Sequence, residues 1–150
     1  MNSSNFKTYI KLIESSSVYE VAQITPITKA TQLSKALKNN ILLKREDLQP
    51  VFSFKIRGAY NKLAKLNKKG ITGPFIAASA GNHAQGFAFG AKSLGLKAYI
   101  VMPITTPSIK VNSVKSFGGK VILHGDNFDE ALQHANELVK KEGYTFIHPY

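Results

Sequence analysis

Short apolar segments alternate with helical patterns through the second half of the chain, and this alternation limits the possible folds more than any other feature. Apolar runs typical of strands lie at 75–78, 99–101, 121–123 and 145–147. Helical periodicity between and after them predicts helices at 83–94, 108–117 and 128–141. Strands and helices that alternate in this way form βαβ units with right-handed crossovers. We therefore expect an α/β fold, in which helices flank a parallel sheet.

The residues at the ends of these helical patterns support the same division. Gly95 follows the first pattern, and Gly118 and Gly119 follow the second, where glycine commonly ends a helix. Asp126 or Asn127 stands where the third helix needs an N-cap.

The first half of the chain is less regular. Apolar spacing predicts a helix over 6–13, and a second helix is expected from about residue 28 to 37. Residues 41–43 are expected to form a short buried strand. A further helix is expected from about residue 54 to 66, with Ile56, Ala59, Tyr60 and Leu63 on its apolar side.

The composition bears on whether the protein binds nucleic acid or a membrane and on the compartment in which it works. The chain has 20 basic and 9 acidic residues, which could indicate nucleic-acid binding. Its lysines are scattered over polar faces and turns without an aromatic and basic strip, so we do not expect a nucleic-acid partner. No apolar run is long enough for a membrane helix, and the absence of cysteine fits a reducing compartment. We expect a cytoplasmic protein without a membrane partner.

Lys55 is the first candidate for chemistry. It lies in Ser-Phe-Lys-Ile-Arg-Gly (53–58), where an extended segment after Pro50 gives way to a helix. The helix dipole disfavours an ammonium there, and Phe52, Phe54 and Ile56 would shield it from water. Both effects favour the free amine that a Schiff-base lysine needs. The alternative is an ordinary surface lysine at a helix start.

The second candidate is the turn at residues 79–83, Ser-Ala-Gly-Asn-His, which follows a strand and precedes a helix. Ligands of open α/β sheets bind beyond the carboxyl ends of the strands, and N–H groups at a helix start suit a carboxylate. Asn82 could donate to an oxygen on a cofactor ring. Alternatively, Gly81 only makes the turn and Asn82 caps the helix, and His83 is structural. The other histidines lack metal-ligand spacing, so no metal is assigned.

At these two motifs the sequence resembles the pyridoxal-phosphate-dependent enzymes of the tryptophan synthase β-like fold (PLP fold type II). More narrowly, it is similar to the biosynthetic threonine dehydratases. The resemblance covers nearly the whole chain and is carried by residues 18–22, 25–26, 43–51, 53–60, 79–86, 101–103 and 117–119. Ala80 and the run 46–51 favour the biosynthetic branch, since serine racemases and degradative dehydratases share the lysine motif.

The resemblance implies a role for each residue of the two motifs. Lys55 would bind pyridoxal 5′-phosphate covalently and move protons at the substrate's α-carbon. Phe54 would pack on the cofactor ring, and Asn82 would hydrogen-bond its 3′-oxygen. The backbone of Ser79, Ala80, Gly81, Asn82 and His83 would bind the carboxylate of a small amino-acid substrate.

The implied reaction is the dehydration and deamination of L-threonine to 2-oxobutanoate and ammonia, the first step toward isoleucine. A broader serine/threonine dehydratase, a serine racemase and a non-catalytic binding lobe are the alternatives. The full-length protein would be a homo-oligomer.

The resemblance also implies that the chain is an incomplete part of such an enzyme. Residues 1–70 would belong to the larger cofactor domain, and 71–150 would form a small α/β domain with a parallel sheet. The glycine-rich loop that binds the cofactor phosphate would lie beyond residue 150, together with the residue facing the pyridine nitrogen and the regulatory domain. We therefore expect the 150-residue chain to be inactive alone.

Overall fold

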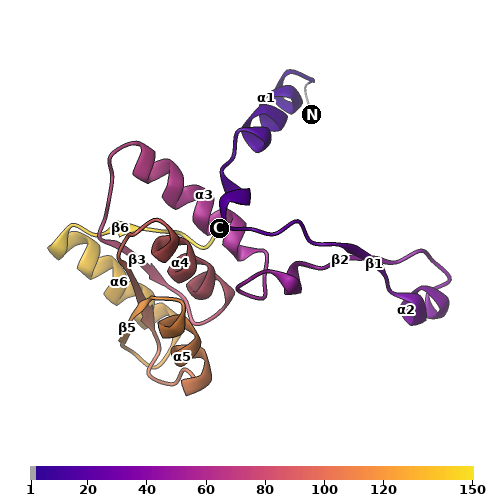
Figure 1. Ribbon diagram of the computed structural model, residues 1–150. Helices are drawn as coiled ribbons and strands as arrows, with labels where there is room; N and C mark the ends of the chain where they lie inside the picture. The colour runs from indigo at the N-terminus through magenta and orange to yellow at the C-terminus, as the bar shows by residue number, and fades with distance from the viewer. Residues whose placement is uncertain (1–2) are drawn as a thin grey trace.

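The computed structural model describes residues 3–150 and contains a four-stranded parallel sheet covered by helices on both faces (Figure 1). The strand order is β5-β4-β3-β6, and all neighbouring strands run parallel. The elements of this α/β core are β3 (Phe75–Ala78), α4 (Asn82–Ser93), β4 (Ala98–Met102), α5 (Ser108–Ser116), β5 (Lys120–Leu123), α6 (Phe128–Glu142) and β6 (Thr145–Phe146). The predicted strands and helices of this half are confirmed within one or two residues.

Strand β3 is buried on both faces, because successive side chains of a strand point to opposite sides. Phe75 and Ala77 belong to the apolar cluster that includes residues of α4 and α5. Ile76 and Ala78 pack with Ala131 and Ala135 of α6 on the other side. This double covering explains the nearly continuous apolar run in the sequence.

Helix α3 (Lys55–Lys68) joins the core through its close contact with α4. At Gly86 an added Cβ would lie 2.9 Å from the backbone carbon of Lys55, and at Gly90 it would lie 3.3 Å from the Cα of Tyr60. The two glycines therefore let the helix backbones approach more closely than side chains would allow. The start of α3 is thereby held against the second turn of α4.

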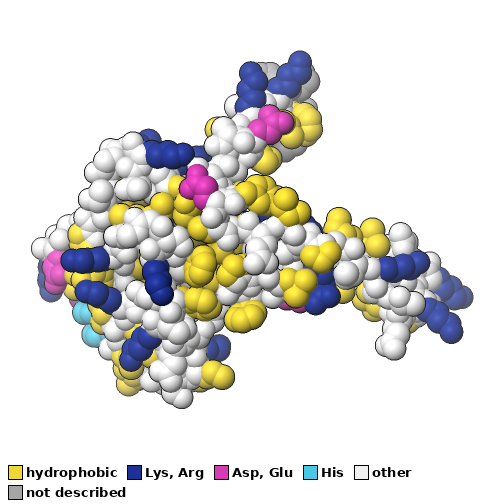
Figure 2. Space-filling view, in the orientation of Figure 1, with side chains coloured by type: hydrophobic (Ala, Val, Ile, Leu, Met, Phe, Trp, Pro, Cys, Tyr) yellow, Lys and Arg dark blue, Asp and Glu magenta, His cyan; other side chains and the backbone are white. Residues whose placement is uncertain are grey.

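The remaining elements are α1 (Ser3–Glu14), the 3₁₀ turn η1 (Val18–Glu20), β1 (Ile27–Lys29), α2 (Thr31–Ala36), β2 (Leu42–Lys44) and the 3₁₀ turn η2 (Glu46–Leu48). Both 3₁₀ turns contact α3, whereas α1 and the arm formed by β1, α2 and β2 extend away from the core (Figure 1). Strands β1 and β2 pair antiparallel as an isolated ribbon. Many apolar side chains of α1 and the ribbon lie on the surface, as Figure 2 shows.

Two expectations for this first half are wrong. The helix expected from residue 28 begins only at Thr31, because residues 27–29 form strand β1. The strand expected to be buried at 41–43 is β2 at 42–44, and all three of its residues are exposed. A two-stranded ribbon with no layer packed on it cannot bury either of its faces.

The predicted helix ends are confirmed. The side chain of Asn127 accepts a hydrogen bond from the Glu130 backbone N–H and so caps α6. Gly95 and Gly118 have φ values of 69° and 95°, the left-handed conformation expected after a helix. Within residues 3–150 we find no helix with the length and apolar character needed to cross a bilayer.

Candidate functional site

Lys55 is the first residue of α3, and its side chain lines a cavity of about 440 Å³. The Nζ atom donates a hydrogen bond to the carbonyl oxygen of Pro149 at 2.7 Å. It also lies 5.7 Å from the ring centroids of both Phe54 and Tyr150. Within residues 3–150 the amine forms no ion pair with a carboxylate. A lysine amine without a carboxylate partner is available to react with an electrophile that enters the cavity.

The expected apolar shield around Lys55 is only partly present. Ile56 is fully buried, but the rings of Phe52 and Phe54 are 71% and 59% exposed. Phe52 adopts a left-handed backbone conformation at φ 58°, and Phe54 occupies the N-cap position of α3. Both rings remain on the surface, Phe54 alone of the two lines the cavity, and Lys55 itself is half-buried.

The 79–83 turn connects the carboxyl end of β3 to the start of α4, as predicted. Gly81 is the N-cap residue, and among residues 3–150 we find no side-chain cap for the first turn of α4. The alternative in which Asn82 caps this helix is therefore wrong, since Asn82 is its first residue and is exposed. Helix α6, by contrast, has a side-chain cap, because Asn127 accepts a hydrogen bond from its first turn. The open N–H groups of α4 can accordingly bind an anion.

His83 connects this turn to the lysine cavity. Its ring is buried, lines the cavity with Lys55 and stacks on Phe87 with 6.1 Å between the ring centroids. The Nε2 atom donates to the carbonyl oxygen of Ile147 at 3.1 Å. Burial lowers the pKa of His83, and the nearby positive charge of Lys55 lowers it further, so the neutral ring predominates near pH 7.

The structure brings the two predicted motifs together, but only some of their residues line the cavity. Lys55 and His83 share the cavity directly, and both contact the segment that follows β6. Ser79, Ala80, Gly81 and Asn82 belong to the adjoining turn and do not line the cavity themselves. Among the described residues, 3–150, no group of three or more histidine or acidic side chains could hold a metal ion.

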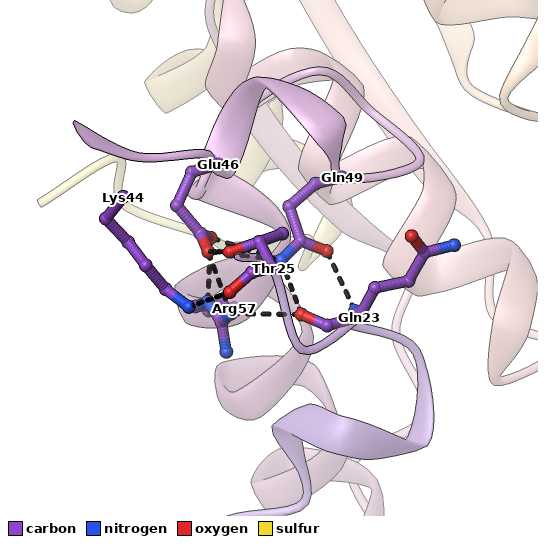
Figure 3. Close-up of polar contacts among 6 residues, drawn as sticks. All are labelled: Gln23, Thr25, Lys44, Glu46, Gln49 and Arg57. Atoms are coloured by element: carbon purple, nitrogen blue, oxygen red, sulfur yellow. Dashed lines mark hydrogen bonds and ion pairs between the residues drawn. The ribbon is translucent and has the colours of Figure 1, made fainter. Parts of the chain in front are cut away.

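Sequence analysis missed a polar network at the start of α3. Figure 3 shows Glu46, Arg57, Gln49 and Thr25 joined by hydrogen bonds, with Gln23 and Lys44 at its edges. The sequence signal for it is a carboxylate in the run 46–51 and an arginine within the lysine motif, which form an ion pair.

Comparisons with known proteins identify relatives of the chain. Residues 18–150 match the family model described as pyridoxal-phosphate dependent enzyme. The biosynthetic L-threonine dehydratase of Pasteurella multocida is 56% identical over 142 residues, which cover 95% of this chain and 28% of that relative. The chain spans about a quarter of the length of the curated relatives it matches.

Two solved structures show the same fold. The processed form of threonine deaminase isoform 2 from Solanum lycopersicum matches with a TM-score of 0.92 and 47% identity, covering 100% of this chain and 41% of that chain. Maize serine racemase matches with a TM-score of 0.81 and 30% identity, covering 88% of this chain and 40% of that chain.

Proposed function

The chain belongs to the family of pyridoxal-phosphate dependent enzymes, and from this membership we propose that it is the N-terminal part of a threonine dehydratase. The expected fold, a parallel sheet of the tryptophan synthase β-like type, is confirmed by the match to threonine deaminase. The proposed reaction converts L-threonine to 2-oxobutanoate and ammonia, as the first step toward isoleucine.

One observation carries the proposal. The Lys55 amine and the buried end of the 79–83 turn, His83, line the same cavity. A covalent lysine site needs a free amine beside a region that binds the substrate's anionic group. The uncapped start of α4 supplies such a region next to the cavity.

The residues present fit pyridoxal phosphate, because an amine without an ion-pair partner suits its aldehyde and an open helix start suits an anion. Lys55 would hold the cofactor. Phe54 would offer an apolar ring face beside Nζ, and Asn82 would donate from its side-chain amide. When bound, the cofactor supplies an electron-accepting ring for charge that develops at the substrate's α-carbon.

The chain's own residues would position the substrate and move its proton. The 79–83 turn would bind the threonine carboxylate through backbone N–H groups at the start of α4 and fix the orientation of the α-carbon. The N–H of Ser79 itself donates to the Val101 carbonyl in the sheet, and that of Gly81 donates to the Ser79 hydroxyl. The Nζ of Lys55 would take the proton from that carbon, the β-hydroxyl would leave with a proton as water, and a second water would release ammonia and 2-oxobutanoate. Neutral His83 adds no positive charge to the cavity, whose lining includes the Lys55 amine.

We propose the domain division at residue 70 as part of the same account. Residues 1–70 would belong to the larger cofactor domain, and 71–150 would form the small α/β domain. The separation of the β1–β2 ribbon from the four-stranded sheet supports this division. Helix α3 would connect the parts, since Ala59 and Leu63 contribute to the core of the second.

We further propose that the full-length protein is cytoplasmic and a homo-oligomer that binds a small amino acid. Light scattering of the purified full-length protein would test its oligomeric state. Oligonucleotide binding that weakens with salt would contradict the expected absence of a nucleic-acid partner.

The activity is tested by substrate profiling of the full-length protein with added cofactor. We expect 2-oxobutanoate and ammonia from L-threonine at a higher kcat/KM than pyruvate from L-serine, and no product from Lys55→Ala. A preference for L-serine, or racemisation of D-serine, would favour the broader dehydratase or the racemase. A correctly folded protein without any of these activities would favour the binding lobe.

A further inference from the structure

The polar network at the start of α3 is centred on an ion pair between Glu46 and Arg57 (Figure 3). Arg57 Nε donates to Glu46 Oε2 at 2.8 Å, and Arg57 Nη2 donates to Glu46 Oε1 at 2.9 Å. Two parallel hydrogen bonds of this kind fix the orientation of both planar groups. The two side chains are only 22% and 16% exposed, which limits screening by water.

Additional hydrogen bonds attach this pair to a third part of the chain. Thr25 donates to Glu46 at 2.6 Å, and Arg57 also donates to the backbone carbonyl of Gln23 at 3.2 Å. Gln49 is buried; its amide donates to Glu46 and to the Gln23 carbonyl and accepts from the Gln23 N–H. Segments 23–25 and 46–49 are therefore joined to the first turn of α3.

The electrostatics keep this network charged over the whole range in which an enzyme would work. The hydrogen bonds from Arg57 lower the pKa of Glu46 to about 2, and the carboxylate in turn raises the pKa of Arg57. Loss of one member would leave the other charge partly buried without a partner, which is costly. The geometry at the start of α3 consequently depends on both side chains.

Arg57 lies in the same helical turn as Lys55, so the network acts close to the reactive amine. The backbone of Lys55 is also confined by α4, where no space remains at Gly86 for a Cβ. Ile56, between the two, is fully buried with Val51. A shift of the first turn would move the Lys55 amine relative to the 79–83 turn.

We propose that Glu46, acting through Arg57, is a positioning residue that sets the place of the Lys55 amine in the cavity. This inference rests on the proposed function of Lys55. Glu46 does not line the cavity itself; it acts through Arg57, whose side chain lines the cavity with Lys55 and belongs to the first turn of α3.

The neighbouring ion pair provides a matched control. Arg45 and Asp47 also form a two-bond pair, at 2.9 and 2.6 Å, directly on either side of Glu46 in the sequence. This pair is more exposed, with side chains 36% and 55% accessible, and it joins two residues of one segment. Its loss should therefore have little effect on α3.

The experiment compares Glu46→Gln, Glu46→Asp and Asp47→Asn in the full-length protein. For each variant, kcat and KM for L-threonine and the thermal midpoint are measured with bound cofactor, and the rate of cofactor attachment to Lys55 is measured on cofactor-free protein. Attachment is followed by borohydride reduction and peptide mapping, and does not require substrate.

We expect Glu46→Gln to lower kcat at least about tenfold and to slow attachment similarly, with KM much less changed, because the turn that binds the carboxylate is untouched. Glu46→Asp should restore most of the loss, and Asp47→Asn should stay within about twofold of the parent. If Glu46→Gln does not fold, Arg57→Lys should give the same pattern, because it keeps the charge but loses the two-bond geometry.

Equal kcat and attachment rates in Glu46→Gln and Asp47→Asn would overturn the proposal. So would a loss in which kcat, KM and the thermal midpoint change together without recovery in Glu46→Asp. If the parent protein attaches cofactor at Lys55 but does not consume L-threonine, the proposed substrate fails, and the attachment rates alone decide the role of Glu46.

Discussion

The α/β core and the N-terminal ribbon bury their apolar side chains to very different extents. The four residues of β3 are at most 1% exposed, whereas Ile27 and Leu42 of the ribbon are 64% and 55% exposed. The sheet is covered by helices on both faces, while the ribbon has no covering layer within residues 3–150. The core can therefore hold its own geometry, and α3 carries Lys55 at the boundary between the two regions.

The largest expected effect concerns activity. The isolated 150-residue chain should give no measurable 2-oxobutanoate from L-threonine, because it spans only about a quarter of the length of its curated relatives. The full-length protein should be active under the same conditions. Product formation by the purified 150-residue chain, abolished by Lys55→Ala, would contradict this prediction.

A truncation in the core should cost much more stability than one in the ribbon. Phe87 is fully buried against the sheet, so Phe87→Ala should lower the free energy of unfolding by about 3–5 kcal/mol. Leu42→Ala in the ribbon should change it by less than about 0.5 kcal/mol. Urea unfolding of the 150-residue chain measures both values, and similar losses would show that the ribbon is as well packed as the core.

The stability of the boundary between the core and the ribbon should fall in acid as Glu46 becomes protonated. Its pKa is lowered from 4.5 to about 2 in the folded chain, chiefly by hydrogen bonds from Arg57. The resulting stability is fully present above about pH 4.5 and is lost as the pH falls through 2, with an upper limit of about 3 kcal/mol.

Glu46→Gln should remove this contribution. Unfolding free energies measured from pH 6 down to pH 2 should therefore fall less steeply in the variant than in the parent. Parallel curves for the two proteins would mean that the carboxylate is not paired in the folded chain.

Alanine substitutions at two glycines of the same boundary should change the stability of the fold in opposite directions. Gly86→Ala places a Cβ 2.9 Å from the backbone of Lys55 and should destabilise by about 1–3 kcal/mol. Gly58, within α3, has no atom within 4 Å of the added Cβ, so Gly58→Ala should stabilise by up to about 1 kcal/mol. Thermal unfolding compares them, and a tolerated Gly86→Ala would show that α3 and α4 are not in close contact.

The fold of the second half could be predicted because each strand is short, apolar and bounded by a helix with clear ends. The ribbon could not, since Ile27-Thr28-Lys29 has no apolar run and its pairing with residues 42–44 leaves both strands exposed. A short strand outside a packed layer carries little pattern in its own sequence.

The sequence revealed those parts of the site that are formed by residues close together in the chain. The lysine motif and the 79–83 turn could be recognised as local patterns. The network at Glu46 and the contacts of Lys55 and His83 with 147–149 could not, because they join residues far apart in the chain. These contacts follow from the tertiary fold, in which the start of α3 lies between the ribbon and the core.

Site mapping of the covalent cofactor adduct tests whether Lys55 is the residue that binds pyridoxal phosphate. The full-length protein is incubated with pyridoxal phosphate, reduced with borohydride and digested, and the modified lysines are identified by mass spectrometry. We expect a pyridoxyl group on Lys55 and none after Lys55→Ala. Modification spread over the exposed lysines, with Lys55 unmodified, would contradict it.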